Sequence, residues 1–155
     1  MKIVSSFLFI LLMSAQAFAE SECYTQEINP CTNKVYASLE QYNTDKQEWA
    51  SIAPESPGLF ALAKAYGIYS REKDFANKLR NDKRAHCYIG CRLSQEMNYR
   101  VAEYVGWLKE DRDIKDCNKS THFDPADYKA TRAGATFGES QTDAAGCVAV
   151  CKRNF

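Results

Sequence analysis

The fold is decided by residues 82–91, which read DKRAHCYIGC. This short stretch contains an acid, a histidine and two cysteines. If it is helical, Asp82 and His86 are four residues apart and share one face, whereas Cys87 and Cys91 share another face about 100° further round the axis. The stretch therefore predicts a helix that presents polar chemistry on one side and crosslinks on the other.

A second cysteine pair with the same spacing lies near the end of the chain, at Cys147 and Cys151. Two helices that each carry such a pair can be joined by two disulfides if they lie side by side. An antiparallel arrangement joins Cys87 to Cys151 and Cys91 to Cys147, and a parallel arrangement exchanges the partners. The spacing does not choose between these arrangements. The competing interpretation is a zinc site formed by the four thiolates.

Residues 1–19 are predicted to form a secretory signal peptide, because Lys2 precedes an apolar run that ends in the cleavage sequence AFA. That run is too short to span a membrane, and no later stretch reaches the ~20 apolar residues that a span requires. Glu22 occupies the position before Cys23 where a lipoprotein signal has a small residue, so we expect cleavage after Ala19 without lipidation. The predicted product is soluble and periplasmic or secreted, with no transmembrane segment.

The mature chain is predicted to form a single domain at residues 20–155, with N-terminal helices at 20–81 and a motif-bearing core at 82–151. Cleavage removes one of 20 basic and none of 20 acidic residues, which leaves a formal charge of −1. This balance gives no electrostatic basis for binding nucleic acid.

All seven cysteines lie in the predicted mature chain, where export favours disulfides. We expect Cys23 and Cys31 to close a small loop, which leaves Cys117 as the odd thiol.

The apolar periodicity predicts an all-α fold of about five to six helices and no sheet. The second expected helix begins at Ser56-Pro57, places Leu59, Leu62, Ala63 and Tyr66 on its inner face, and ends near Gly67. The other expected helices lie at about 35–52, 81–96, 99–115, 125–137 and 143–152, with a short one around Phe75 and Leu79. Asn98 and the pair Asp124-Pro125 have the residue types of helix N-termini.

Three of the expected helices contribute candidate catalytic residues, namely His86, Glu110, Asp113 and Asp127. Glu110 and Asp113 share a helix face, and Asp127 shares one with Thr131. Converging on one point, the histidine and three carboxylates could hold a divalent metal ion that activates water. They could also act without metal, with His86 as a general base. The structural alternative is a buried polar network or a solvated helix face.

Three short motifs resemble the signature of a family of small bacterial periplasmic lipoproteins of uncharacterised function. They are DKxxH at residues 82–86, GxxKExxD at 106–113, and Asp127 followed seven residues later by Gly134. The cysteine pairs are also similar to those of cysteine-rich domains at the carboxy ends of Rhs-type polymorphic toxins. Neither resemblance implies a reaction. This chain lacks the lipobox of the lipoproteins and the repeats of the toxins.

Two function classes follow from the sequence. The chain is either an exported hydrolase with a pocket of His86, Glu110, Asp113 and Asp127, or a non-catalytic envelope protein in which these residues fix the helix packing. A histidine on a disulfide-linked helix also resembles phospholipase A2 enzymes, but Cys87 stands where these have a calcium-binding aspartate, and no glycine-rich calcium loop precedes it. His122 lies in a polar loop without a spaced partner, so we expect it to be exposed.

Overall fold

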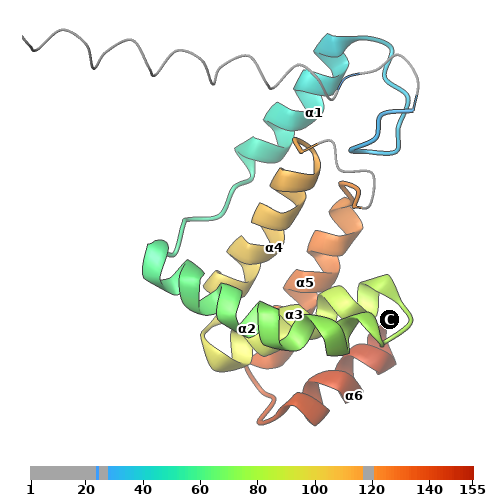
Figure 1. Ribbon diagram of the computed structural model, residues 1–155. Coiled ribbons are helices and arrows are strands. Elements are labelled where there is room, and N and C mark those ends of the chain that lie inside the picture. The colour runs from blue at the N-terminus through green and yellow to red at the C-terminus, as the bar shows by residue number, and fades with distance from the viewer. Residues whose placement is uncertain (1–23, 25–27, 117–120) are drawn as a thin grey trace, which may run out of the picture.

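The computed structural model describes Tyr24 and residues 28–116 and 121–155 (Figure 1). The predicted signal peptide, Cys23 and Cys117 lie outside this part, so the predictions made for them stay predictions. The described residues form six helices and no strand, apart from one isolated bridge between Ile28 and Val35. The all-α fold class is confirmed.

The helices are α1 (Leu39–Ser51), α2 (Leu59–Asn77), α3 (Asp82–Glu96), α4 (Tyr99–Asp113), α5 (Pro125–Gly138) and α6 (Ala144–Asn154). Side chains cap most of their N-termini, since Asn81, Asn98, Asp124 and Asp143 each accept a hydrogen bond from a backbone N–H of the first turn. The predicted caps at Asn98 and Asp124 are confirmed. Pro125 occupies the first turn of α5, where its missing N–H costs nothing.

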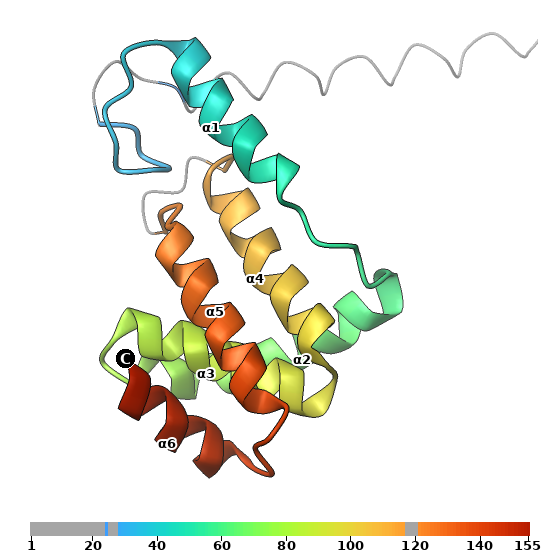
Figure 2. The ribbon, with the colours of Figure 1, turned by 180° about the vertical axis from the view of Figure 1, so that it is seen from behind.

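Helix α3 is the centre of the fold, because it contacts α2, α4, α5 and α6. Helices α4 and α5 lie side by side, and α3 crosses them near one end (Figures 1 and 2). Helix α1 lies at the opposite end of α4. There Trp49 packs edge-on against Phe123 and Tyr128, and its backbone carbonyl accepts a hydrogen bond from Trp107.

Two disulfides join α3 to the antiparallel helix α6. Cys87 is bonded to Cys151 and Cys91 to Cys147, and the Cα atoms of each pair are 5.7 Å apart. All four cysteines are completely buried. The predicted pairing of the two helices is confirmed, and the antiparallel alternative is the one that forms.

Helices α3 and α5 approach so closely that their contact requires glycine. A Cβ atom at Gly134 would lie 1.9 Å from the carbonyl oxygen of Cys87, and one at Gly90 would lie 2.1 Å from that of Thr131. Both neighbours are backbone atoms and cannot rotate away. Gly134 of the sequence motif therefore fixes the distance between the two helices that carry His86 and Asp127.

Helix α2 differs from the prediction in both length and orientation. It continues through Gly67 to Asn77, because a glycine in mid-helix lowers stability without ending a helix that is held by other contacts. Its buried face consists of Ala65, Ile68, Glu72 and Ala76. Leu59 and Tyr66, predicted to point inward, are 84% and 70% exposed. Helix α2 therefore has a second apolar face that the fold does not use.

Candidate functional site

A cavity of about 650 Å³ lies between α2, α3, α4 and the start of α5. Tyr69 and Lys73 of α2 form one wall, and α3 forms the opposite wall. The cavity is open to solvent, because Tyr69 is 42% exposed and the side chain of Asp82 is 69% exposed. The polar residues that line it are Lys73, Asn77, Asp82, His86, Lys109, Thr121, His122, Asp124, Asp127 and Thr131.

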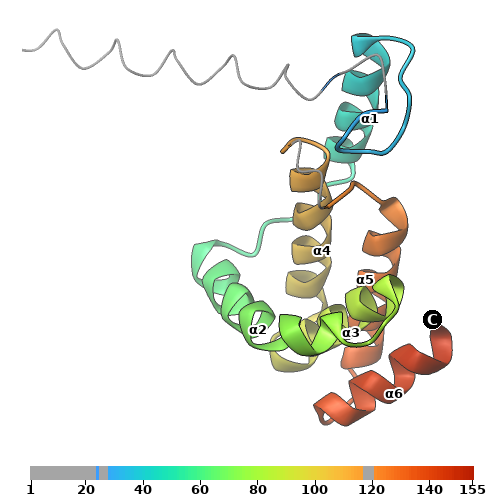
Figure 3. The ribbon, with the colours of Figure 1, turned by 45° about the vertical axis from the view of Figure 1, so that its right-hand side comes forward.

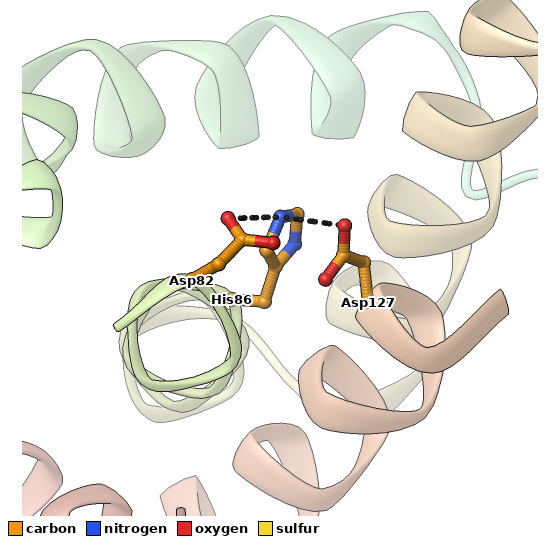
Figure 4. A group of neighbouring side chains, drawn as sticks. All are labelled: Asp82, His86 and Asp127. Carbon is orange, nitrogen blue, oxygen red and sulfur yellow. Dashed lines mark ion pairs between the residues drawn. The ribbon is translucent and has the colours of Figure 1, made fainter. Parts of the chain in front are cut away.

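His86 lies between two carboxylates in this cavity (Figure 4). Its Nε2 atom is 3.4 Å from Oδ2 of Asp127 and 3.7 Å from Oδ1 of Asp82. One ligand atom from each of the three residues lies within 4.8 Å of the others. Both measured distances exceed the usual 2.7–3.2 Å of a direct hydrogen bond. The imidazole and the two carboxylates therefore face one another without forming a direct hydrogen bond.

Lys83 orients the two carboxylates from the other side. Its Nζ atom lies 2.5 Å from Oδ1 of Asp127, 3.6 Å from Oδ2 of Asp82 and 2.5 Å from Oδ2 of Asp124. The oxygens that face Lys83 are not the ones that face His86. Burial opposes the charge on Lys83, but Asp124 and Asp127 outweigh it and raise the pKa of the ammonium. Lys83 contacts one carboxylate oxygen of Asp82 and one of Asp127, and it therefore holds the other oxygen of each toward the imidazole.

The His86 ring is neutral at pH 7. Burial lowers its pKa to about 4, and the positive charge of Lys109 acts in the same direction. The Nδ1 atom lies 3.5 Å from the hydroxyl of Thr131, which itself donates to the Asp127 carbonyl at 3.0 Å. This arrangement favours the tautomer with the proton on Nδ1. The Nε2 lone pair then faces the carboxylates of Asp82 and Asp127.

Glu110 and Asp113 lie behind the cavity and do not line it. Both contact Lys109, whose Nζ atom is 2.9 Å from Oε1 of Glu110 and 2.8 Å from Oδ2 of Asp113. The same Nζ atom is 3.8 Å from Oδ2 of Asp127. The four predicted residues are therefore linked in space, but only His86 and Asp127 reach the cavity.

Glu110 also anchors the start of α5. Its Oε2 atom accepts a 2.8 Å hydrogen bond from the backbone N–H of Asp124, the N-cap of that helix. The side chain is completely buried, which raises the pKa of Glu110 to about 7 against the opposing effect of Lys109. Because α5 carries Asp127, Glu110 positions the candidate ligand from a distance.

His122 is exposed, as predicted, but it also lines the cavity. Its Nδ1 atom lies 2.9 Å from the carbonyl oxygen of Pro30, and the N–H of Phe123 donates to the carbonyl of Cys31 at 2.6 Å. The N-terminal segment therefore holds the loop that closes one end of the cavity.

Three residues of this site were left out of the predicted catalytic set: Lys83, Lys109 and Asp82, although Asp82 was predicted to share the polar face of His86. All three belong to the DKxxH and GxxKExxD motifs, so the signal was present. Lysines beside acids on a helix also have the pattern of a solvated face, and periodicity alone does not separate the two.

Comparison with protein-family models, with curated proteins and with solved structures found no match. Among the helices that the structure describes, none is long and apolar enough to cross a membrane.

Proposed function

We propose that this protein is an exported hydrolase that holds a divalent metal ion with Asp82, His86 and Asp127. The observation that carries the proposal is the position of the His86 Nε2 atom, which faces two carboxylate oxygens at 3.4 and 3.7 Å in a solvent-open cavity. A lone pair and two carboxylates repel one another unless a proton or a cation lies between them.

The two distances from the His86 Nε2 atom to the carboxylate oxygens are close to those between ligands of a single ion. Two ligands about 2.1 Å from a metal are about 3.0 Å apart at a right angle and about 3.4 Å apart at the tetrahedral angle. Imidazole and carboxylate ligands suit zinc, iron and manganese. The local charge favours a cation. Lys83 and Lys109 contact five carboxylates, those of Asp82, Glu110, Asp113, Asp124 and Asp127, and Lys73 is the third lysine at the cavity, which leaves a formal excess of two negative charges.

A divalent ion at this position would lower the pKa of a bound water and polarise a substrate carbonyl or phosphoryl oxygen. The surrounding residues orient the ligands and can stabilise charge on a substrate. The Thr131 hydroxyl oxygen lies 3.5 Å from Nδ1, where it can accept a hydrogen bond from the Nδ1–H group and keep the ring in the ligand tautomer. Lys83 fixes the carboxylates. Lys109 places a positive charge 3.8 Å from Asp127, where it can stabilise negative charge that develops on a substrate.

The convergence of the motifs also supports the resemblance to the periplasmic lipoprotein family. The three motifs are separated in sequence, yet DKxxH supplies the imidazole, GxxKExxD supplies Lys109 and the anchor Glu110, and Gly134 sets the distance to α5. Each motif residue discussed here has a role at one site.

Calorimetric titration of the purified protein with Zn²⁺ and Mn²⁺ tests the proposal. The parent should bind one ion, and His86→Gln and Asp127→Asn should each weaken binding by roughly tenfold or more. Asp111→Asn is the matched control, because Asp111 is a buried carboxylate that pairs with Lys115 away from the cavity. Metal-loaded parent should hydrolyse p-nitrophenyl acetate or bis-p-nitrophenyl phosphate, and His86→Gln should not. Absence of both binding and turnover in the parent would refute the proposal.

A second candidate function is a non-catalytic envelope protein. The observation that favours it is the ion-pair group of Lys109, Glu110 and Asp113, in which both carboxylates are buried and off the cavity. Such a group holds helices in register without chemistry. The same titration separates the candidates, because this function requires no metal.

Export is part of the proposal and rests on the signal-like sequence at residues 1–19 together with the two disulfides, which persist in oxidising compartments. Intact-mass measurement of the secreted or periplasmic protein should give a chain that begins at Glu20. A lipid adduct on Cys23 would contradict this start.

A further inference from the structure

Helices α2 and α3 run back along each other after the short turn that joins them (Figures 1 and 3). Two contacts fix their alignment. The hydroxyl of Tyr88 donates a 2.6 Å hydrogen bond to Oε2 of Glu72, and the rings of Phe75 and Tyr88 lie 5.1 Å apart. This antiparallel alignment places Lys73 at about the level of His86. Both residues line the cavity, so the Lys73 ammonium group and the candidate ligand lie on opposite walls.

Lys73 differs from the other two lysines of the cavity in having no counter-ion. Lys83 lies 2.5 Å from a carboxylate oxygen of Asp127, and Lys109 lies 2.9 Å from one of Glu110. Among the residues that the structure describes, no carboxylate forms an ion pair with Lys73. A lysine that lines a cavity without a counter-ion can bind an anionic group of a ligand.

Two neutral polar side chains of the cavity can donate hydrogen bonds to the same ligand. Asn77 follows Lys73 by one helical turn, and Thr121 lies in the loop before α5. The hydroxyl oxygen of Thr121 is buried, and no group in the described part of the chain forms a hydrogen bond with it. A buried hydroxyl without a partner is unfavourable, and an oxygen atom of a ligand in the cavity can supply the missing bond.

The charge of the site favours an anion only when the proposed ion is bound. Without an ion, the formal excess of two negative charges repels an anion. A divalent cation removes this excess and contacts one negatively charged oxygen, and Lys73 contacts another from the opposite wall. A phosphate ester matches both contacts, because its non-bridging oxygens carry negative charge on the reacting group itself. A neutral carboxylic ester has no charge for Lys73 to bind.

We propose that the site hydrolyses a phosphate ester, with one phosphoryl oxygen at the ion and another at the Lys73 ammonium group. This proposal rests on the proposed metal-dependent hydrolase and names its substrate class. In the reaction, the oxygen of water forms a bond to phosphorus, the bond from phosphorus to the alcohol oxygen breaks, and one proton of the water passes to that alcohol oxygen. Lys73 stabilises the negative charge on the phosphoryl oxygens as the bonds change.

Kinetics with a charged and a neutral ester test this proposal. In the Mn²⁺-loaded protein, Lys73→Gln should lower kcat/KM for bis-p-nitrophenyl phosphate about tenfold, the value of one hydrogen bond to a charged group. The same variant should hydrolyse p-nitrophenyl acetate as the parent does. Lys73→Arg should retain most of the activity toward the phosphate diester, because it keeps the positive charge.

Calorimetric titration with inorganic phosphate gives a readout that does not depend on turnover. The Mn²⁺-loaded parent should bind phosphate, and the metal-free parent should bind it much more weakly. Lys73→Gln should weaken phosphate binding to the loaded protein about tenfold without changing the affinity for Mn²⁺. Lys78→Gln is the matched control, because Lys78 follows the same helix and is exposed but does not line the cavity. This control should behave as the parent does in every assay.

Two results would overturn this proposal and leave the hydrolase in place. One is a loaded parent that hydrolyses p-nitrophenyl acetate but neither hydrolyses the phosphate diester nor binds phosphate. The other is an equal effect of Lys73→Gln and Lys78→Gln on the phosphate diester, which would show that Lys73 does not bind the substrate. A parent that binds no Mn²⁺ or Zn²⁺ would instead refute the metal site and this proposal with it, and the metal titration identifies that case.

Discussion

Replacing Gly134 with alanine tests whether the backbone contact between α3 and α5 holds the site together. The added methyl carbon would lie 1.9 Å from the carbonyl oxygen of Cys87 and 2.7 Å from its carbon, whereas real Cβ atoms stay beyond 3.0 Å. The helices must therefore separate by about 1 Å or more. Overpacking of this kind costs about 1–3 kcal/mol and occasionally more, and better helix propensity returns about 1 kcal/mol. Because the clashing atoms belong to the backbone, the upper end of the overpacking range applies, and we expect a net loss of about 2 kcal/mol or more.

Gly67→Ala is the matched control, because Gly67 also lies inside a helix but a Cβ atom there would meet nothing within 4 Å. This variant should gain about 1 kcal/mol from propensity alone. Urea denaturation with the disulfides intact measures both changes, and thermal melts should move in opposite directions by roughly 3–5 °C for each kcal/mol. Equal or greater stability of Gly134→Ala relative to the parent would refute the close contact. Metal affinity should fall in Gly134→Ala and not in Gly67→Ala, because only α5 carries Asp127.

Two further predictions concern the pH dependence of stability, measured by urea unfolding between pH 4 and pH 8. The pKa of His86 is 6.5 in the unfolded chain and about 4 in the folded protein. The contribution of the neutral ring to the free energy of unfolding is therefore fully present above pH 6.5 and is lost as the pH falls toward 4. The change amounts to about 3 kcal/mol, and His86→Gln should abolish it. The pKa of Glu110 rises from 4.5 to about 7, so its contribution is present below pH 4.5 and is lost as pH rises through 7, and Glu110→Gln should remove this opposite slope of similar size. Unchanged slopes in both variants would contradict the burial of these two groups.

Much of the fold was predictable because its signals are local. Residue types at Asn98 and Asp124 identify helix starts, and the two cysteine pairs identify helices that must be neighbours. The direction of α6 relative to α3 was not predictable, since both pairings satisfy the same spacing. The choice depends on the path of the chain through α4 and α5, which involves contacts distant in sequence.

The orientation of α2 was predicted wrongly for a physical reason. Its sequence offers two apolar faces, one with Leu59 and Tyr66 and one with Ala65 and Ile68. Periodicity favours the face with the larger side chains. The structure instead buries the smaller ones, which allow α2 to lie close to α3, and the large residues remain exposed. An apolar pattern identifies a helix but not which of two faces the core will use.

The residue types of the candidate site could be predicted from the sequence, but the role of each residue could not. His86, Glu110, Asp113 and Asp127 do lie in one linked group. Only the structure separates His86 and Asp127, which reach the cavity, from Glu110 and Asp113, which lie behind it. The separation depends on the packing of α4 against α5, because the Lys109 side chain contacts carboxylates of both helices. Spacing along a helix gives the face of a side chain, whereas the depth of the side chain depends on the neighbouring helix.

The same helix carries both the crosslinks and the imidazole, and this has a consequence for stability. Carboxylates gathered around Lys83 and Lys109 in a partly buried site repel one another, so the site is expected to lower stability. The disulfides of Cys87 and Cys91 stabilise a different face of α3, and closing loops of 64 and 56 residues contributes about 4 kcal/mol for the first bridge in the chain-entropy model. Since the bridges fix α3 without touching the cavity, they can offset that repulsion and leave Asp82 and His86 free to serve a ligand.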